Sequence, residues 1–328
     1  MKSDVLIGID IGGTKGAVSV GEETESGVNV IRKVQFATQN TPDATIRLLI
    51  ETLDGLIDQL KLQLTIRAIG ISCGSPLDSQ KGLILSPPNL PNWDHVDIIA
   101  PFKKYQVPVG LQNDANACGL AEWKWGAGKG YQNVVFLTFG TGMGAGLILN
   151  GKLYTGTNDM AGEVGHIRLK EDGPVGYGKK GSFEGFCSGG GIARLATTLA
   201  KEAIEAGKPP EFCQSLEALD QITAKRVGLS AQNGDPLALK VYQIVGQQLG
   251  KGLAILIDLL NPERIIIGSI YGRQKAILEP IVKAEIEREA LSDSRRVCQI
   301  VPAGLGESVG DLASLSVALN ALDMERSK

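Results

Sequence analysis

The chain has 328 residues, more than a single hydrophobic core usually supports, so we expect two lobes. Its 43% hydrophobic and 21% charged residues are typical of a globular protein. A net charge of −3 gives no reason to expect nucleic acid or a membrane surface as a partner, and no stretch is long and apolar enough to span a bilayer.

The cysteines indicate a reducing compartment. Five of them are scattered along the chain, and none forms a C-x-x-C pair. This odd number and spacing favour reduced thiols over a disulfide framework or a zinc knuckle. We therefore predict a cytoplasmic protein.

The first element is a hairpin around a glycine turn. Apolar strands at 5–9 and 17–20 flank Asp10-Ile-Gly-Gly-Thr-Lys15. The amides of such a turn and the Thr14 hydroxyl can point at one ligand. The pattern G-x-x-x-x-G-K-[ST] of a P-loop is absent.

A structural helix, a strand and a proline-rich loop follow. Apolar residues recur at helical spacing from Ile46 to Leu60, and residues 66–72 are typical of a strand. The loop at 86–93 carries two Asn and a Trp. Such residues suit plain turns, or a substrate loop in which Asn89 bonds hydroxyl groups.

The central motif is Leu-Gln-Asn-Asp-Ala-Asn at 111–116, between a short apolar run and a helical pattern. This places the Asp114 carboxylate at a strand-to-helix turn, where a side chain can face a cleft. There it could take a proton from a substrate hydroxyl. The alternative is that Asp114 simply caps the helix.

A second hairpin repeats the first. Strands at 134–139 and 147–149 flank Gly140-Thr-Gly-Met-Gly-Ala-Gly146. The glycines nearly match the dinucleotide fingerprint, but that fingerprint needs a helix after the turn. We therefore set a dehydrogenase aside and expect two hairpins, one per lobe, that grip the phosphates of one nucleotide.

Polar residues and glycines follow the second hairpin. Glu163 and His166 are close enough to reach one ligand, or to form a surface ion pair. A helix beginning near 188–191 could bind an anion or simply start with glycines. Later strands at 264–267 and 299–302 alternate with helices, which predicts α/β layers, and the last helix at 312–322 could return to the first lobe.

Taken together, these motifs resemble the ROK family (repressors, open reading frames and sugar kinases), and within it the glucokinase-like sugar kinases. The resemblance covers nearly the whole chain. It is carried by residues 10–15, 88–90, 113–116, 140–144, 163–166 and 261–263 in this order.

The resemblance implies an α/β fold of the two-lobed actin-like ATPase type, a ribonuclease H-like repeat with a central inter-lobe cleft. We expect an N-terminal lobe of residues 1–117 plus 312–328 and a larger C-terminal lobe of residues 118–311. It also implies ATP-dependent transfer of the γ-phosphoryl group to a hydroxyl, usually the 6-hydroxyl, of a hexose such as glucose. An N-acetylhexosamine (N-acetylmannosamine or N-acetylglucosamine) is the alternative substrate.

The resemblance also assigns roles to residues. Asp114 becomes the catalytic base, and Asp10 lies near the Mg²⁺ that accompanies ATP. The expected sugar ligands are Asn89, Asn113, Glu163, His166 and Glu184. The expected ATP contacts are Asp10, Gly12, Gly13, Thr14, Lys15, Thr141, Gly142 and Gly268.

This chain departs from the family at a zinc-binding segment that many members carry. The three cysteine positions hold Val175, Tyr177 and Ser182, and a structural zinc needs about four ligands. We therefore expect no zinc. Fewer glycines near Gly268 leave the adenine contacts open.

Two other classes of protein compete with a kinase. A sugar-responsive repressor would carry a helix-turn-helix before the first hairpin, whereas the first strand here begins by Val5. A non-catalytic sugar-binding ROK protein would not need Asp10 and Asp114. The resemblance further suggests a homodimer with a small-molecule sugar as its partner.

Overall fold

The computed structural model describes residues 3–24, 27–60 and 64–326, and these form two compact units. Unit 1 comprises residues 1–132, 146–161 and 307–328, and unit 2 comprises residues 133–145 and 162–306. Unit 1 thus reaches beyond the expected 1–117 and 312–328. Residues 1–2, 25–26, 61–63 and 327–328 of the expected N-terminal lobe lie outside the described chain.

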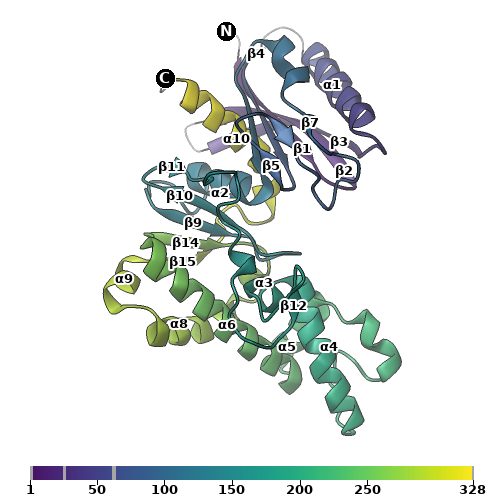
Figure 1. Ribbon diagram of the computed structural model, residues 1–328, viewed down its shortest axis with the longest axis vertical. Helices are drawn as coiled ribbons and strands as arrows, with labels where there is room; N and C mark the ends of the chain where they lie inside the picture. The colour runs from purple at the N-terminus through teal and green to yellow at the C-terminus, as the bar shows by residue number, and fades with distance from the viewer. Residues whose placement is uncertain (1–2, 25–26, 61–63, 327–328) are drawn as a thin grey trace. The chain divides into compact units, whose positions relative to one another are not determined.

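Unit 1 is built on a five-stranded sheet of order β3-β2-β1-β4-β8 (Figure 1). Strands β1, β4 and β8 are parallel to one another, whereas β2 is antiparallel to both β1 and β3. The strands are β1 (Ser3–Ile11), β2 (Lys15–Thr24), β3 (Gly27–Ala37), β4 (Leu64–Cys73) and β8 (Val109–Asn113). The predicted first hairpin is therefore confirmed.

Helix α1 (Pro42–Gln59) covers one face of this sheet. The Thr41 hydroxyl caps it by accepting the Ala44 amide, and Pro42 occupies the first turn, where its missing N–H is harmless. Its apolar stripe, which includes Leu49, Leu53 and Leu56, is buried in the core of unit 1. The helix predicted from Ile46 to Leu60 is thus confirmed.

Helix α10 (Val309–Arg326) packs against β1, β4 and β8, so the last helix returns to the first lobe as predicted. Three glycines in register, Gly8, Gly70 and Gly110, make room for it. A Cβ on Gly70 would lie 2.1 Å from the Ser314 carbonyl oxygen and 2.2 Å from the Ala318 nitrogen. The sheet and the helix can therefore approach closely because these positions lack side chains.

Further short elements complete unit 1, apart from the first residues of β10 and η4 (Ala145 and Gly306), which belong to unit 2. They are β5 (Leu77–Asp78), β6 (Leu83–Ile84), β7 (Val96–Asp97), η1 (Ala100–Tyr105), α2 (Asp114–Trp125), β10 (Ala145–Leu149), β11 (Lys152–Leu153) and η4 (Gly306–Ser308). Strands β5, β6 and β7 form a small sheet that frames the proline-rich loop.

Unit 2 contains the parallel strands β9 (Val134–Leu137), β14 (Arg264–Ile267) and β15 (Gln299–Pro302). All four residues of β9 and three of the four in β14 are buried, as expected of parallel strands in the middle of a sheet that is covered on both faces. The helices are α3 (Phe183–Phe186), α4 (Gly189–Glu205), α5 (Ala224–Gln232), α6 (Pro236–Leu260), α7 (Ile270–Arg273), α8 (Lys275–Glu289) and α9 (Ser292–Val297). The remaining elements are η2 (Val164–His166), η3 (Leu216–Gln221), β12 (Val175–Gly176) and β13 (Lys179–Lys180).

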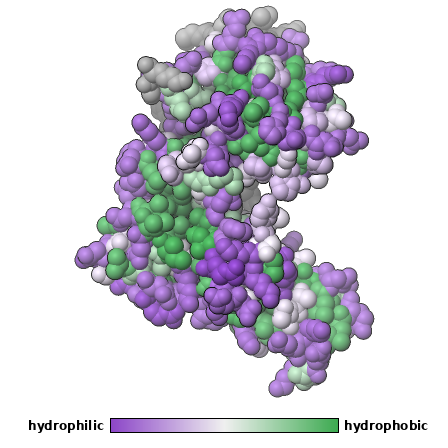
Figure 2. Space-filling model, viewed as in Figure 1, coloured by the Kyte–Doolittle hydropathy of each residue, from purple (hydrophilic) through white to green (hydrophobic). Residues whose placement is uncertain are grey.

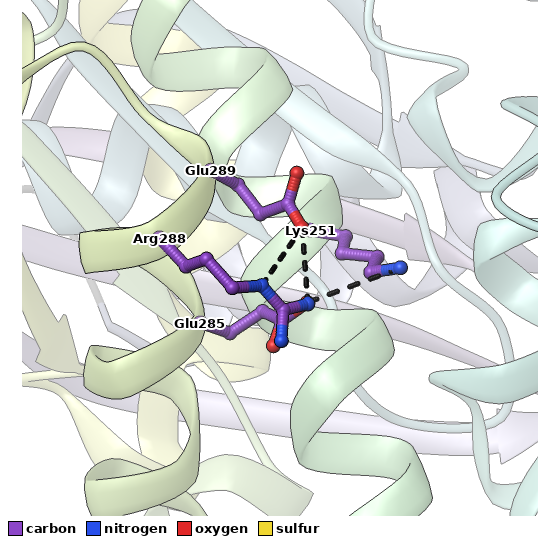
Figure 3. Close-up of polar contacts among 4 residues, drawn as sticks. All are labelled: Lys251, Glu285, Arg288 and Glu289. Carbon is purple, nitrogen blue, oxygen red and sulfur yellow. Dashed lines mark hydrogen bonds and ion pairs between the residues drawn. The ribbon is translucent and has the colours of Figure 1, made fainter.

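Helices α6 and α8 of unit 2 pack closely through glycines. A Cβ on Gly250 would lie 2.4 Å from the Cβ of Glu285. The buried Glu285 carboxylate is compensated by Arg288 at 2.5 Å and Lys251 at 4.0 Å (Figure 3). Because a buried carboxylate needs such partners, these cations belong to the packing of unit 2.

Within the described residues, no helix has both the length and the apolar character needed to cross a membrane. All five cysteines are free thiols.

The glycine row predicts a strong, position-specific effect on stability. Gly70→Ala should lower the free energy of unfolding by roughly 3 kcal/mol, since the methyl group overlaps backbone atoms of α10. Gly55→Ala in α1 is the control: a Cβ there meets nothing within 4 Å, and the change should stabilise by up to about 1 kcal/mol. Urea unfolding measures both, and equal midpoints for the two variants would contradict this packing.

Candidate active site

The carboxyl ends of β1, β4 and β8 bring distant residues together in unit 1. The register pairs Asp10 with Ser72 and Ser72 with Gln112, and it pairs Cys73 with Asn113. Polar side chains at the ends of parallel strands are a common way to build a site in α/β proteins.

Asp114 is the first residue of α2, directly after β8. The Asn113 Oδ1 caps this helix by accepting the Asn116 amide at 2.8 Å, so the alternative that Asp114 is the cap is wrong. Asp114 instead accepts a hydrogen bond from the Ser72 hydroxyl at 3.1 Å. Its side chain is exposed, whereas Asn113 is buried.

The protein environment raises the pKa of both Asp10 and Asp114. Burial, followed by the charge of Asp114, raises the pKa of Asp10 to about 6, although Lys33 acts in the opposite direction. Asp114 has an accessible face, but the protein around it displaces enough water to raise the pKa of its carboxyl group, and the Ser72 hydrogen bond partly offsets this. Burial likewise raises the pKa of Cys118 to about 12, so that thiol is a poor nucleophile.

The first glycine turn is closed by the Gly12 amide, which donates to the Lys15 carbonyl at 3.0 Å. Gly13, Thr14 and Lys15 are exposed on it. The proline-rich loop lies against this turn, because a Cβ on Gly13 would meet the Asn89 carbonyl oxygen at 2.3 Å. The exposed Asn89 side chain is thus held beside the turn.

The second glycine turn belongs to unit 2. The Thr138 amide donates to the Gly144 carbonyl at 2.9 Å, and the Gly144 amide donates to the Thr138 hydroxyl at 2.8 Å. The Met143 amide donates to the Glu184 carboxylate at 3.1 Å. Glu184 therefore lies directly on this turn.

The structure brings Glu163, His166 and Glu184 together in unit 2. Burial and the charge of Glu184 raise the pKa of Glu163, while His166 counteracts them. Among the described residues Glu163 and His166 form no ion pair at contact distance, so the surface ion-pair alternative is not supported. Both side chains are exposed and can reach a ligand.

A pocket of about 940 Å³ opens beside the second turn, wholly within unit 2. At one end the Gly189 amide, at the start of α4, donates to the Gly140 carbonyl at 2.7 Å. Ser269 lines the pocket with φ 54°, a conformation that favours glycine. The lining residues are Gly140, Thr141, Gly189, Gly190, Ala193, Ile222, Thr223, Ala224, Lys225, Leu229, Gln232, Tyr242, Ser269, Ile270, Arg273 and Gln274.

The segment that corresponds to the family's zinc site is a hairpin of β12 and β13. Tyr177 and Gly178 form its turn with φ 43° and 75°. The Ser182 hydroxyl accepts the Gly185 amide at 3.0 Å, and Lys179 donates to the His166 carbonyl at 2.8 Å. Among the described residues, no group of three His, Cys, Asp or Glu side chains that could hold a metal ion is found.

Sequence reasoning missed Ser72 and most of the pocket. Ser72 is a polar residue at the end of a predicted strand, and a parallel pairing with the first strand would have placed it beside Asp10. The pocket residues come from five separate segments without a common motif. Gly268 precedes Ser269 and donates its amide to Leu137, whereas Ser269 itself faces the pocket.

Comparison with known proteins identifies the family to which these motifs belong. The ROK family model matches residues 6–320. The chain is 31% identical to a glucokinase of Streptomyces coelicolor over 96% of this chain and 97% of that protein. A ROK family glucokinase from Streptomyces griseus, solved in complex with glucose and AMPPNP, is 29% identical with a TM-score of 0.72, covering 99% of this chain and 100% of that one.

A ROK family transcriptional regulator also matches, at 25% identity and a TM-score of 0.83, covering 98% of this chain and 79% of that one. The chain therefore belongs to the ROK family, as its motifs predicted, and has the two-lobed actin-like ATPase fold of the family's kinases. The prediction of an ATP-dependent kinase class is confirmed as well, whereas the sugar is left open.

The raised pKa of Asp10 predicts a pH-dependent stability cost. Because its folded pKa of about 6 exceeds the ordinary value of 3.8, the folded state holds the proton more tightly, and stability falls as pH rises from about 4 to 6. Asp10→Asn should therefore stabilise the protein at pH 7.5 by roughly 1–2 kcal/mol after allowance for solvent screening, and by much less at pH 4. Thermal unfolding at both pH values measures this, with the exposed Asp172→Asn as control; an equal effect at both pH values would contradict it.

Proposed function

We propose that the chain is an ATP-dependent hexose kinase that transfers the γ-phosphoryl group to the 6-hydroxyl of glucose or a similar hexose. The observation that carries this is the exposed Asp114 carboxylate, oriented by Ser72 and adjacent to Asp10. The similarity to glucokinases over nearly the full length of both chains supports it.

In this proposal Asp114 takes the proton of the attacking hydroxyl. Removal of water around its carboxylate raises its pKa and makes it a stronger base, and the Ser72 hydroxyl fixes one of its oxygens. Asn113 and Asn89 of unit 1, and Glu163, His166 and Glu184 of unit 2, bind the sugar. The Asn113 oxygen is used in the helix cap, so its amide nitrogen is the group that donates to the sugar.

The nucleotide is ATP, and its adenosine part takes the pocket of unit 2. Thr141 and Gly142 of the second turn, with Gly12, Gly13, Thr14 and Lys15 of the first, bind the phosphates. Phosphoryl transfer depends chiefly on positioning and on stabilising charge, which backbone amides and cations supply.

Magnesium accompanies the nucleotide and neutralises phosphate charge when bound. Mg²⁺ is commonly held by one or two carboxylates together with phosphates and water. Asp10 fits this role, because its charge is destabilised by burial and by Asp114 and would be relieved by a cation. Gly268 supports the turn before Ser269 at the nucleotide pocket.

We also propose a homodimeric cytoplasmic enzyme. Figure 2 shows apolar residues on the surface of unit 2. The exposed apolar side chains of unit 2 include Leu259, which is 73% exposed, and Leu291, which is 67% exposed. Such apolar exposure is typical of an interface. Light scattering should give twice the 34.7 kDa chain mass; the mass of one chain would refute the dimer.

The proposed activity is tested by incubating the purified protein with MgATP and a panel of sugars. The panel contains glucose, fructose, mannose, N-acetylglucosamine and N-acetylmannosamine. We expect sugar-dependent ADP release with glucose and a product whose phosphorus couples to the C6 protons in NMR. ADP release with an N-acetylhexosamine alone would establish the alternative substrate, and none with any sugar would refute the kinase.

Replacing the base should abolish turnover while leaving the fold intact. Asp114→Asn should lower kcat by about 100- to 10,000-fold, the usual contribution of a general base, with little change in ATP affinity. Asp54→Asn, which alters an exposed ion pair with Lys104, serves as the control and should retain activity. Unchanged kcat in Asp114→Asn would remove this residue from the mechanism.

Ser72→Ala tests whether the hydrogen bond from Ser72 tunes the base Asp114, and it should have a smaller effect than Asp114→Asn. Loss of the hydroxyl donor removes the hydrogen bond that lowers the pKa of Asp114, so the acid limb of the kcat/KM profile should move to higher pH. The decrease in kcat should be roughly tenfold or less, since the carboxylate remains. A profile that stays in place would show that Ser72 does not act on Asp114.

A further inference from the structure

The pocket of unit 2 has two chemically different ends. One end lies at the second glycine turn, where a Cβ on Gly189 would lie 3.2 Å from the Gly140 carbonyl oxygen and 3.9 Å from the Ala224 Cβ. Helix α5 runs from Ala224 to Gln232, so Gln232 lies about 12 Å further along the helix axis. A ligand whose phosphates sit at the turn thus has room to extend its base toward Gln232.

The end of the pocket near Gln232, where the base would lie, carries apolar and polar side chains. The exposed Leu229 of α5 offers apolar surface to a flat ring at this end, whereas Ile270 lies near Gly189 at the other end of the pocket. The Tyr242 hydroxyl and the Gln274 amide lie close together, because a Cβ on Gly228 would approach both. A planar base at this end would contact both apolar and polar side chains, which is the usual composition of a ligand pocket.

The orientation of the Gln232 side-chain amide is fixed by its neighbours. Its Nε2 donates to the Arg273 carbonyl at 3.2 Å and to the Gln274 Oε1 at 3.3 Å. A backbone carbonyl can only accept, so the nitrogen end must face Arg273. No hydrogen bond to the Gln232 Oε1 is found among the residues that the structure describes, which leaves this oxygen as an acceptor.

We propose that Gln232 selects nucleotides that carry an amino group at position 6 of the purine. Adenine presents an N–H donor there, which the Gln232 Oε1 can accept. Hypoxanthine and guanine present an oxygen, which would face a second acceptor. This inference rests on the proposed function, since it assigns a residue to the base of the nucleotide.

Direct binding tests the inference without any sugar or turnover. Isothermal calorimetry with Mg²⁺ compares ADP, IDP and purine riboside 5′-diphosphate, which differ at position 6 in bearing an amino group, an oxygen or hydrogen. The wild-type protein should bind ADP about three- to tenfold more tightly than either analogue, the value of one partly exposed hydrogen bond. Gln232→Ala should bind all three within about twofold of one another.

The control variant is Lys225→Ala, which alters another pocket side chain that carries a charge but no acceptor. It should change the affinities for the three nucleotides by a common factor and leave their ratio intact. Gln232 ends α5 and is exposed, so its replacement should not unfold the protein, which circular dichroism checks. An ADP preference that persists in Gln232→Ala, or its absence in the wild type, would overturn the inference.

The outcomes also separate this inference from the proposed kinase activity. Equal binding of all three nucleotides refutes the role of Gln232 and leaves the kinase standing. No binding of any nucleotide at millimolar concentration refutes both.

Discussion

The arrangement of unit 1 depends on three parallel strands that end at the same level. Because β1, β4 and β8 are in register, Asp10 and Ser72 lie side by side, and Asp114 follows the last strand. Burial, followed by the negative charge of Asp114, raises the pKa of Asp10 to about 6. The ionised form of Asp10 is thus destabilised in the folded protein, and a bound cation would stabilise it. Such perturbed carboxyl groups are common at catalytic sites.

In unit 2, hydrogen bonds to the backbone hold the second glycine turn in place. The second glycine turn is held from one side by Glu184, which accepts the Met143 amide, and from the other by the start of α4, whose Gly189 amide donates to Gly140. Gly165 can lie against the Met143 carbonyl because it has no side chain: a Cβ there would be 2.2 Å from that oxygen. Glu163 and His166 therefore lie on a segment that packs against the turn that we propose binds phosphate.

Local patterns in the sequence predicted much of this fold. The hairpin at 5–20, helix α1 and the return of α10 follow from apolar periodicity and glycine turns. The sequence identified the motif around Asp114 but not which residue caps α2, because Asn113 and Asp114 are adjacent and Asn and Asp are equally good caps. Only the structure showed that Asn113 caps the helix and that Asp114 accepts a hydrogen bond from Ser72. The pocket of unit 2 could not be predicted from the sequence because its residues, from Gly140 to Gln274, share no local spacing.

The most direct test of the central claim is the titration of Asp10 itself. Carbon-13 NMR of protein labelled at the aspartate carboxyl groups, with Asp10→Asn used to assign the signal, follows its protonation. The account predicts a pKa of about 6 for Asp10, and a shift to lower values when Mg²⁺ and ADP are added. Titration near the ordinary value of 3.8, with no response to Mg²⁺ and nucleotide, would contradict it.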